Sequence, residues 1–133
     1  MKQKLPKKTH CQRLENRVSE GMPDVYMCMN GVVVWLELKI IKHSKVSISK
    51  SQIAWHLAHT RCGGVSFFLL HDPSSGDVIL FEGSKVTEIH GSRIDALRPA
   101  SLYDGSMSDF PAALRDAARD SWLDALRPAS SDL

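Results

Sequence analysis

Two apolar stretches separated by a tight-turn signal dominate the first third of the chain. Residues 24–29 and 32–41 are apolar at nearly every position, and Asn30-Gly31 lies between them. Asn-Gly between apolar strands favours a type I′ turn, because both central residues of that turn need a positive φ. The sequence therefore predicts a β-hairpin. Its second strand is apolar on both alternating faces, so it should lie inside a sheet.

The remaining pattern predicts alternating helices and strands. Cys11, Leu14 and Val18 recur at helical spacing, which predicts a helix over about residues 9–20. Ser49 or a neighbour caps a following helix. The other expected elements are a helix at about 50–62, strands at about 65–70 and 78–82, a short helix near 84–90 and an amphipathic helix at about 109–127.

Length and composition fit one compact domain. The chain has 133 residues, of which 43% are hydrophobic, and this is the range of ordinary globular proteins. We expect an α/β fold with a mixed, twisted sheet of four or five strands in the order α-β-β-α-β-β. Residues 1–90 would form the core, and residues 91–133 a carboxy-terminal extension within the same compact unit.

Charge is distributed unevenly along the sequence. Residues 1–50 hold ten Lys/Arg against four Asp/Glu, whereas residues 51–133 hold seven against eleven. A basic amino-terminal half suggests a polyanionic partner. The three cysteines form no CxxC pair, which argues against a structural zinc site. The sequence contains no run of about 18 apolar residues, so it predicts no membrane span. We expect an intracellular protein.

Two carboxylates interrupt the apolar hairpin. If Met29 faces Val32 across the turn, counting outward brings Asp24 opposite Glu37. Lys39 lies two residues beyond Glu37, and therefore on the same face of the strand. Like charges directly opposite one another destabilise a sheet, more so in apolar surroundings.

A divalent cation would neutralise this arrangement. Mg²⁺ is commonly held by one or two carboxylates, with water and substrate phosphates completing its shell. The hairpin is then a metal platform, and Lys39 holds a water or a phosphate oxygen. The spacing fits equally well an ion pair between Glu37 and Lys39 at the end of the strand, with Asp24 in a turn after Pro23.

The same residues carry a family resemblance. The stretch GMPDVYMCMNGVVVWLELKI resembles the PD-(D/E)XK nuclease superfamily, with Pro23-Asp24 as the PD and residues 37–39 as the (D/E)XK. Glu15 before the motif, Gly21 within it and Gln52 in SQIAW make the chain most similar to the virus-type replication-repair nuclease branch (VRR-NUC). The resemblance covers about residues 10–82 and implies a restriction-endonuclease-like core.

The resemblance also implies roles for single residues. Asp24, Glu37, the carbonyl of Leu38 and Glu15 would bind Mg²⁺ or Mn²⁺. Lys39 would position the attacking water, and Gln52 would help orient the site. The implied activity is hydrolysis of DNA phosphodiester bonds that leaves a 5′-phosphate.

Basic side chains near these residues are candidates for DNA contact. Lys42, Lys45 and Lys50 flank the expected site, and His56 lies one helical turn after Gln52. Each lysine taken singly fits a solvated basic loop equally well, and His56 fits a position at the edge of the core.

Three functions remain open from the sequence. The first is a metal-dependent endonuclease selective for branched DNA such as a Holliday junction, acting as a homodimer and of a size that suits a phage or mobile element. The second is a sequence-specific restriction or homing endonuclease, and the third is a non-catalytic DNA-binding module. The string DALRPAS occurs at 95–101 and again at 124–130, and nothing in the sequence explains this repetition.

Overall fold

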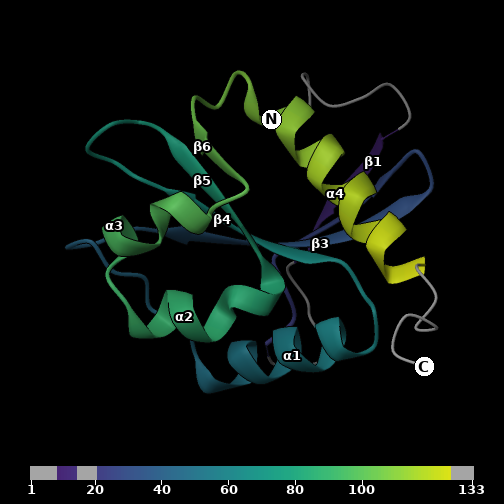
Figure 1. The fold of residues 1–133 in the computed structure, drawn as a ribbon, viewed down its shortest axis with the longest axis horizontal. Coiled ribbons are helices and arrows are strands. Elements are labelled where there is room, and N and C mark those ends of the chain that lie inside the picture. The colour runs from purple at the N-terminus through teal and green to yellow at the C-terminus, as the bar shows by residue number, and fades with distance from the viewer. Residues whose placement is uncertain (1–8, 15–20, 127–133) are drawn as a thin grey trace.

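The computed structural model describes residues 9–14 and 21–126 (Figure 1). Its strands are β1 (Thr9–Arg13), β2 (Val25–Met29), β3 (Val32–Ile40), β4 (Ser66–His71), β5 (Val78–Glu82) and β6 (Tyr103–Gly105). Its helices are α1 (Lys50–Arg61), η2 (Gly83–Lys85), α2 (Val86–Gly91), α3 (Ile94–Leu97), η3 (Arg98–Ala100) and α4 (Phe110–Leu126).

The strands form one mixed sheet with helices on both faces. Its order is β1-β2-β3-β4-β5-β6, and the β3–β4 pair, which α1 connects, is parallel while the other pairs are antiparallel. Figure 1 shows α4 across one face of the sheet and α1 and α2 across the other. The expected α/β architecture is confirmed, with six strands within residues 9–14 and 21–126 where four or five were predicted.

Each face of the sheet covers its own apolar core. On the α4 face, buried side chains of β2, β3, β4 and β5 pack against Phe110, Leu114 and Ala118. On the other face, Phe68, Leu70, Ile79 and Phe81 pack against Val86, Ile89 and Ile94, and Ile53 and Leu57 of α1 border this cluster. A sheet buried on both faces explains why β4 and β5 are apolar at consecutive positions.

The predicted hairpin forms with the predicted register. Met29 pairs with Val32 and Val25 with Leu36, and Asn30 and Gly31 both have a positive φ, of 51° and 84°. β3 lies between β2 and β4, as its two apolar faces indicated.

The helix predicted over residues 9–20 is wrong for its first part. Residues Thr9–Arg13 form β1, whose Cys11 pairs with Met27 of β2 and packs against the α4-side core. Pairing with the open edge of β2 satisfies main-chain groups along the whole strand, and this long-range gain overrides the helical spacing of three apolar residues. Residues 15–20, the rest of that helix, lie outside the described part of the chain.

The carboxy-terminal part contains elements for which the sequence analysis predicts neither helix nor strand. Between residues 91 and 108 the chain forms α3, η3 and the short strand β6, which pairs with β5. The amphipathic helix predicted at 109–127 is α4, and its Leu114 and Ala118 lie in the core. Within residues 9–14 and 21–126, no helix combines the length and apolarity needed to cross a bilayer.

Candidate active site

The ladder between β2 and β3 ends one pair before the two carboxylates. The residue opposite Leu38 in the register is Pro23, which has no N–H to contribute to a ladder. The Leu38 N–H instead donates to Oδ2 of Asp24 at 3.2 Å. The directly opposed pair of Asp24 and Glu37 that we predicted is therefore not part of the ladder. Asp24 comes immediately before the first residue of β2, and its carboxylate lies against the peptide unit that joins Glu37 and Leu38.

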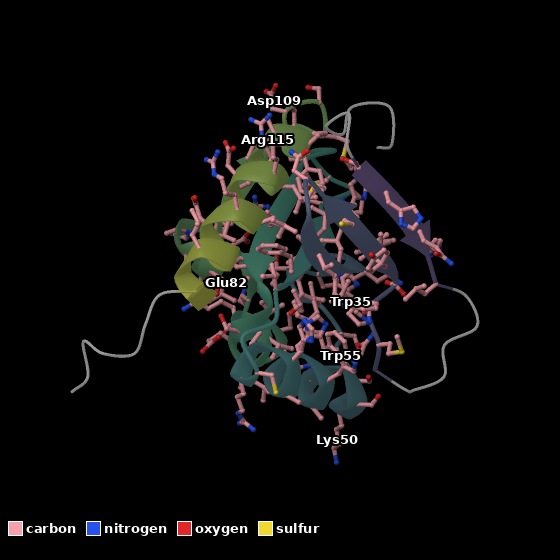
Figure 2. The ribbon with its side chains drawn as sticks, turned by 90° about the vertical axis from the view of Figure 1, so that its right-hand side faces the viewer. Trp35, Lys50, Trp55, Glu82, Asp109 and Arg115 are labelled. Atoms are coloured by element: carbon pink, nitrogen blue, oxygen red, sulfur yellow. The ribbon has the colours of Figure 1, made fainter. Side chains whose placement is uncertain are left out.

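Glu37 is a buried acid on the α1 face of the sheet. The residue is 2% exposed. Its neighbours Leu36 and Leu38 belong to the core under α4, so alternation directs Glu37 to the opposite face. Trp35, on the same face, contacts Trp55 of α1 edge to face with ring centroids 5.7 Å apart, and the two labelled residues lie close together in Figure 2. Glu37 is thus held in the layer between β3 and α1.

Lys39 is tied to the start of α1 by a side-chain hydrogen bond. Its Nζ donates to Oε1 of Gln52 at 3.0 Å. The same oxygen accepts the Ser49 N–H at 3.0 Å, and the Ser49 hydroxyl accepts the Gln52 N–H at 3.1 Å, which completes a capping box. The cap fixes the Gln52 side chain, and Gln52 in turn fixes the amine of Lys39 on the face that carries Glu37.

The loop that leads to Asp24 also rests on the start of α1. Gly21 has a φ of 85°, and a Cβ at this position would collide with the main-chain carbonyl of Ser51. Only glycine combines this conformation with so close an approach. The first turn of α1 therefore supports both sides of the candidate site, Lys39 through Gln52 and Asp24 through the loop from Gly21.

The donors at this site suit a hard divalent cation. The Asp24 and Glu37 carboxylates and the Leu38 carbonyl supply only oxygen, which Mg²⁺ and Mn²⁺ prefer, and two carboxylates are a usual protein share of a Mg²⁺ shell. Among the residues that the structure describes, no group of three or more His, Cys, Asp or Glu side chains could hold a metal ion. The fourth predicted ligand, Glu15, lies outside those residues. An ion bound by Asp24 and Glu37 would therefore need water and phosphate as its other ligands.

An open groove of about 580 Å³ begins at the site. It is lined by Leu38, Lys39, Ile40, Lys42, Lys45, Val46, Ser47 and His90. The lining includes three lysines and no carboxylate, so the groove is electropositive. A phosphodiester backbone lying in it would bring its phosphates past Lys39.

Two of the predicted DNA contacts lie elsewhere. Lys50 is exposed at the first position of α1, and Figure 2 shows its side chain directed away from the rest of the molecule. His56 is fully buried, with its Nδ1 2.9 Å from the Ser66 hydroxyl. Burial lowers the pKa of His56 to about 4, with smaller contributions from His59 and Lys39. A neutral, buried ring does not reach DNA, so the predicted DNA contact of His56 is wrong and its role is packing.

The predicted cap at Ser49 is confirmed, whereas two other features of this site were not predicted. The first is the Gln52 half of the capping box, which has a readable signature because Ser49 and Gln52 follow the S-x-x-Q pattern. The position of His90 at the groove has no signal in the local sequence, because α2 lies far along the chain from residues 38–47, which line the rest of the groove.

The fold is similar to that of a solved nuclease. The structure of the Holliday junction resolvase Hjc from the archaeal hyperthermophile Archaeoglobus fulgidus superposes with a TM-score of 0.51 at 12% sequence identity, over 77% of this chain and 86% of that one. At this identity the likeness shows the fold, and it confirms the restriction-endonuclease-like architecture expected from the sequence. No family model and no curated protein matches the chain.

Proposed function

We propose that this protein is a metal-dependent DNA endonuclease. The observation that carries the proposal is the arrangement around Leu38, whose N–H binds the Asp24 carboxylate and whose neighbour Glu37 is buried. Lys39, held by Gln52, lines a groove together with Lys42 and Lys45. Burying the carboxylate of Glu37 costs folding free energy. Its presence is explained by the chemistry of a site.

The residues of the site divide the work of phosphodiester hydrolysis. Asp24, Glu37 and the Leu38 carbonyl would hold Mg²⁺ or Mn²⁺, which when bound supplies charge stabilisation for the phosphate and a lowered pKa for water. Lys39, oriented by Gln52, would donate hydrogen bonds to the attacking water or to a phosphate oxygen. Glu15 would add a further carboxylate.

We further propose that the substrate is branched DNA. The support is the resolvase-like fold together with the motif resemblance, which also leads us to assign the chain to the VRR-NUC branch. A junction offers two cleavage points related by two-fold symmetry, so a homodimer with two such sites would be the natural device. Lys42 and Lys45 would contact the backbone of one arm.

A cleavage panel tests this proposal. Purified protein is incubated with a four-way junction, a flap, a splayed duplex and a linear duplex of the same sequence, each with Mg²⁺, with Mn²⁺ or with a chelator. We expect cleavage of the branched substrates with either metal, products with 5′-phosphate ends, and little cleavage of the linear duplex.

The panel also separates the alternatives. Cleavage of one defined sequence in linear duplex would replace branch selectivity with sequence specificity. Binding of the junction without cleavage under all metal conditions would contradict the enzymatic proposal and leave a DNA-binding module.

A further inference from the structure

A strained two-residue turn carries two of the groove lysines. Just after β3, the main chains of Lys42 and Lys45 exchange hydrogen bonds of 2.9 and 3.0 Å. The central residues, His43 and Ser44, have φ values of 53° and 63°. Such a type I′ turn favours Asn-Gly. Residues with a Cβ persist in this conformation only where their surroundings hold them.

Contacts to the start of α3 hold this turn. The Ser44 carbonyl accepts the Ile94 N–H at 2.7 Å. The Ser44 hydroxyl lies 3.4 Å from Oδ2 of Asp95. Ser44, which has a positive φ, thus attaches the turn to α3, about fifty positions further along the sequence.

Asp95 is itself held by a guanidinium that binds three carboxylates. Arg98 contacts Asp95 through Nε at 3.3 Å, Asp72 through Nη2 at 2.8 Å and both oxygens of Asp104 through Nη1 at 3.0 Å. We call these four residues the Arg98 hub. The hub joins α3, the turn after β4 and the edge strand β6. Asp95 and Arg98 belong to the first DALRPAS string, which gives that copy a structural role.

The turn is shared by two hollows on the surface. His43 and Ser44 line a hollow of about 360 Å³ together with three hub residues, Asp72, Asp95 and Arg98. Lys42 and Lys45 line the groove that begins at Lys39. The turn of residues 42–45 therefore lies between the Arg98 hub and the groove.

We propose that Arg98 is a positioning residue for DNA binding: through Asp95 and Ser44 it holds the turn that presents Lys42 and Lys45 to the phosphate backbone. The inference rests on the proposed function for its ligand. Arg98 touches no DNA, and its effect passes entirely through the conformation of residues 42–45.

The test compares junction binding by four variants across a salt series, without divalent metal. Lys45→Ala sets the scale, and should weaken binding about tenfold at about 0.1 M salt and reduce the salt slope by about 1. Arg98→Ala should weaken binding at least as much. Arg115→Ala, which removes the same charge from the exposed surface of α4, should change affinity by less than about twofold.

Asp95→Ala distinguishes the effect of the turn's conformation from the effect of charge on DNA binding. It also provides a second test in case the Arg98→Ala variant does not fold. Asp95 is 65% exposed, so its loss is tolerable for folding. Removing a negative charge near the groove would tighten binding by electrostatics alone, whereas release of the turn should weaken it. Tighter binding by Asp95→Ala would overturn the inference.

A rescue completes the test. His43→Asn combined with Ser44→Gly gives the turn its preferred residues and keeps the carbonyl that Ile94 binds. Added to Arg98→Ala, this pair should restore the affinity and the salt slope. Failure to restore either would show that Arg98 acts through general stability, and would overturn the inference.

Amide hydrogen exchange measures how firmly the turn of residues 42–45 is held, and it needs no DNA. The Lys42 and Lys45 amides should exchange faster in Arg98→Ala than in the wild-type protein, and unchanged exchange would overturn the inference. If the wild-type protein does not bind the junction, the proposed function fails, while the exchange rates still decide whether Arg98 holds the turn.

Discussion

Gln52→Ala should remove the hydrogen bond that links the amino-terminal cap of α1 to the amine of Lys39. The substitution removes one oxygen that accepts two hydrogen bonds, from Nζ of Lys39 and from the Ser49 N–H, both at 3.0 Å. The first bond bears on catalysis because it orients Lys39. The second bears on stability because it completes the capping box of α1.

The two losses differ in size. A hydrogen bond to a charged group contributes about 1.5–3 kcal/mol, and a neutral one about 0.5–1.5 kcal/mol. If the whole of the Lys39 bond is used in the transition state, its loss slows cleavage by about 10- to 150-fold. The lost bond to Ser49 lowers the free energy of unfolding by about 1 kcal/mol.

Single-turnover cleavage of a junction at saturating protein, together with urea unfolding, measures both quantities. Ser49→Ala is the matched control, since it removes the side-chain cap at a cost of about 1 kcal/mol and leaves the Lys39–Gln52 bond in place. Gln52→Glu, which keeps an acceptor for both donors, should stay folded and active. The reasoning is refuted if Ser49→Ala loses as much rate as Gln52→Ala while both remain folded.

Two further predictions concern the elements around the site. The pKa of His56 is lowered from 6.5 to about 4, first by burial. The unfolded chain therefore binds more protons between these values, and the free energy of unfolding should fall as pH drops from 6.5 to about 4, by at most about 1.4 kcal/mol per pH unit. His56→Leu should flatten this dependence in urea titrations, and an unchanged slope would contradict it. Gly21→Ala should destabilise the protein by more than Gly76→Ala. Both glycines have a left-handed φ, but an added Cβ would collide with Ser51 only at Gly21 and would have nothing within 4 Å at Gly76. Chemical denaturation compares the two, and equal losses would show that the contact with Ser51 does not matter.

Local signals predicted much of the fold. Asn30-Gly31 fixed the hairpin, and its register holds as far as Val25 opposite Leu36. The strand at 78–82 has the predicted bounds. These features depend on residues close together in the sequence, where turn chemistry and period decide the outcome.

The misses depend on contacts between distant segments. β1 forms because β2 offers an open edge, which no local pattern reveals. Within the site, the grouping of Asp24, Glu37 and Lys39 as metal and water ligands stays a prediction, and the structure places Asp24 against the peptide unit between Glu37 and Leu38. The sequence did not indicate that Pro23 ends the ladder, so that the Asp24 carboxylate accepts the Leu38 N–H. The ion pairs of Arg98 reach 26 residues back to Asp72, beyond any sequence pattern.

Glu37→Gln is the sharpest test of whether the buried Glu37 carboxylate takes part in metal-dependent DNA cleavage. Glutamine keeps the size of this buried side chain and removes its charge, and Glu82→Gln makes the same change at an exposed position two strands away. On a four-way junction with Mg²⁺, we expect Glu37→Gln to cut at least about a thousandfold more slowly, since several kcal/mol of metal-dependent stabilisation are lost, while it binds the junction normally. Glu82→Gln should cut at the wild-type rate. Cleavage at the wild-type rate by folded Glu37→Gln would contradict the account.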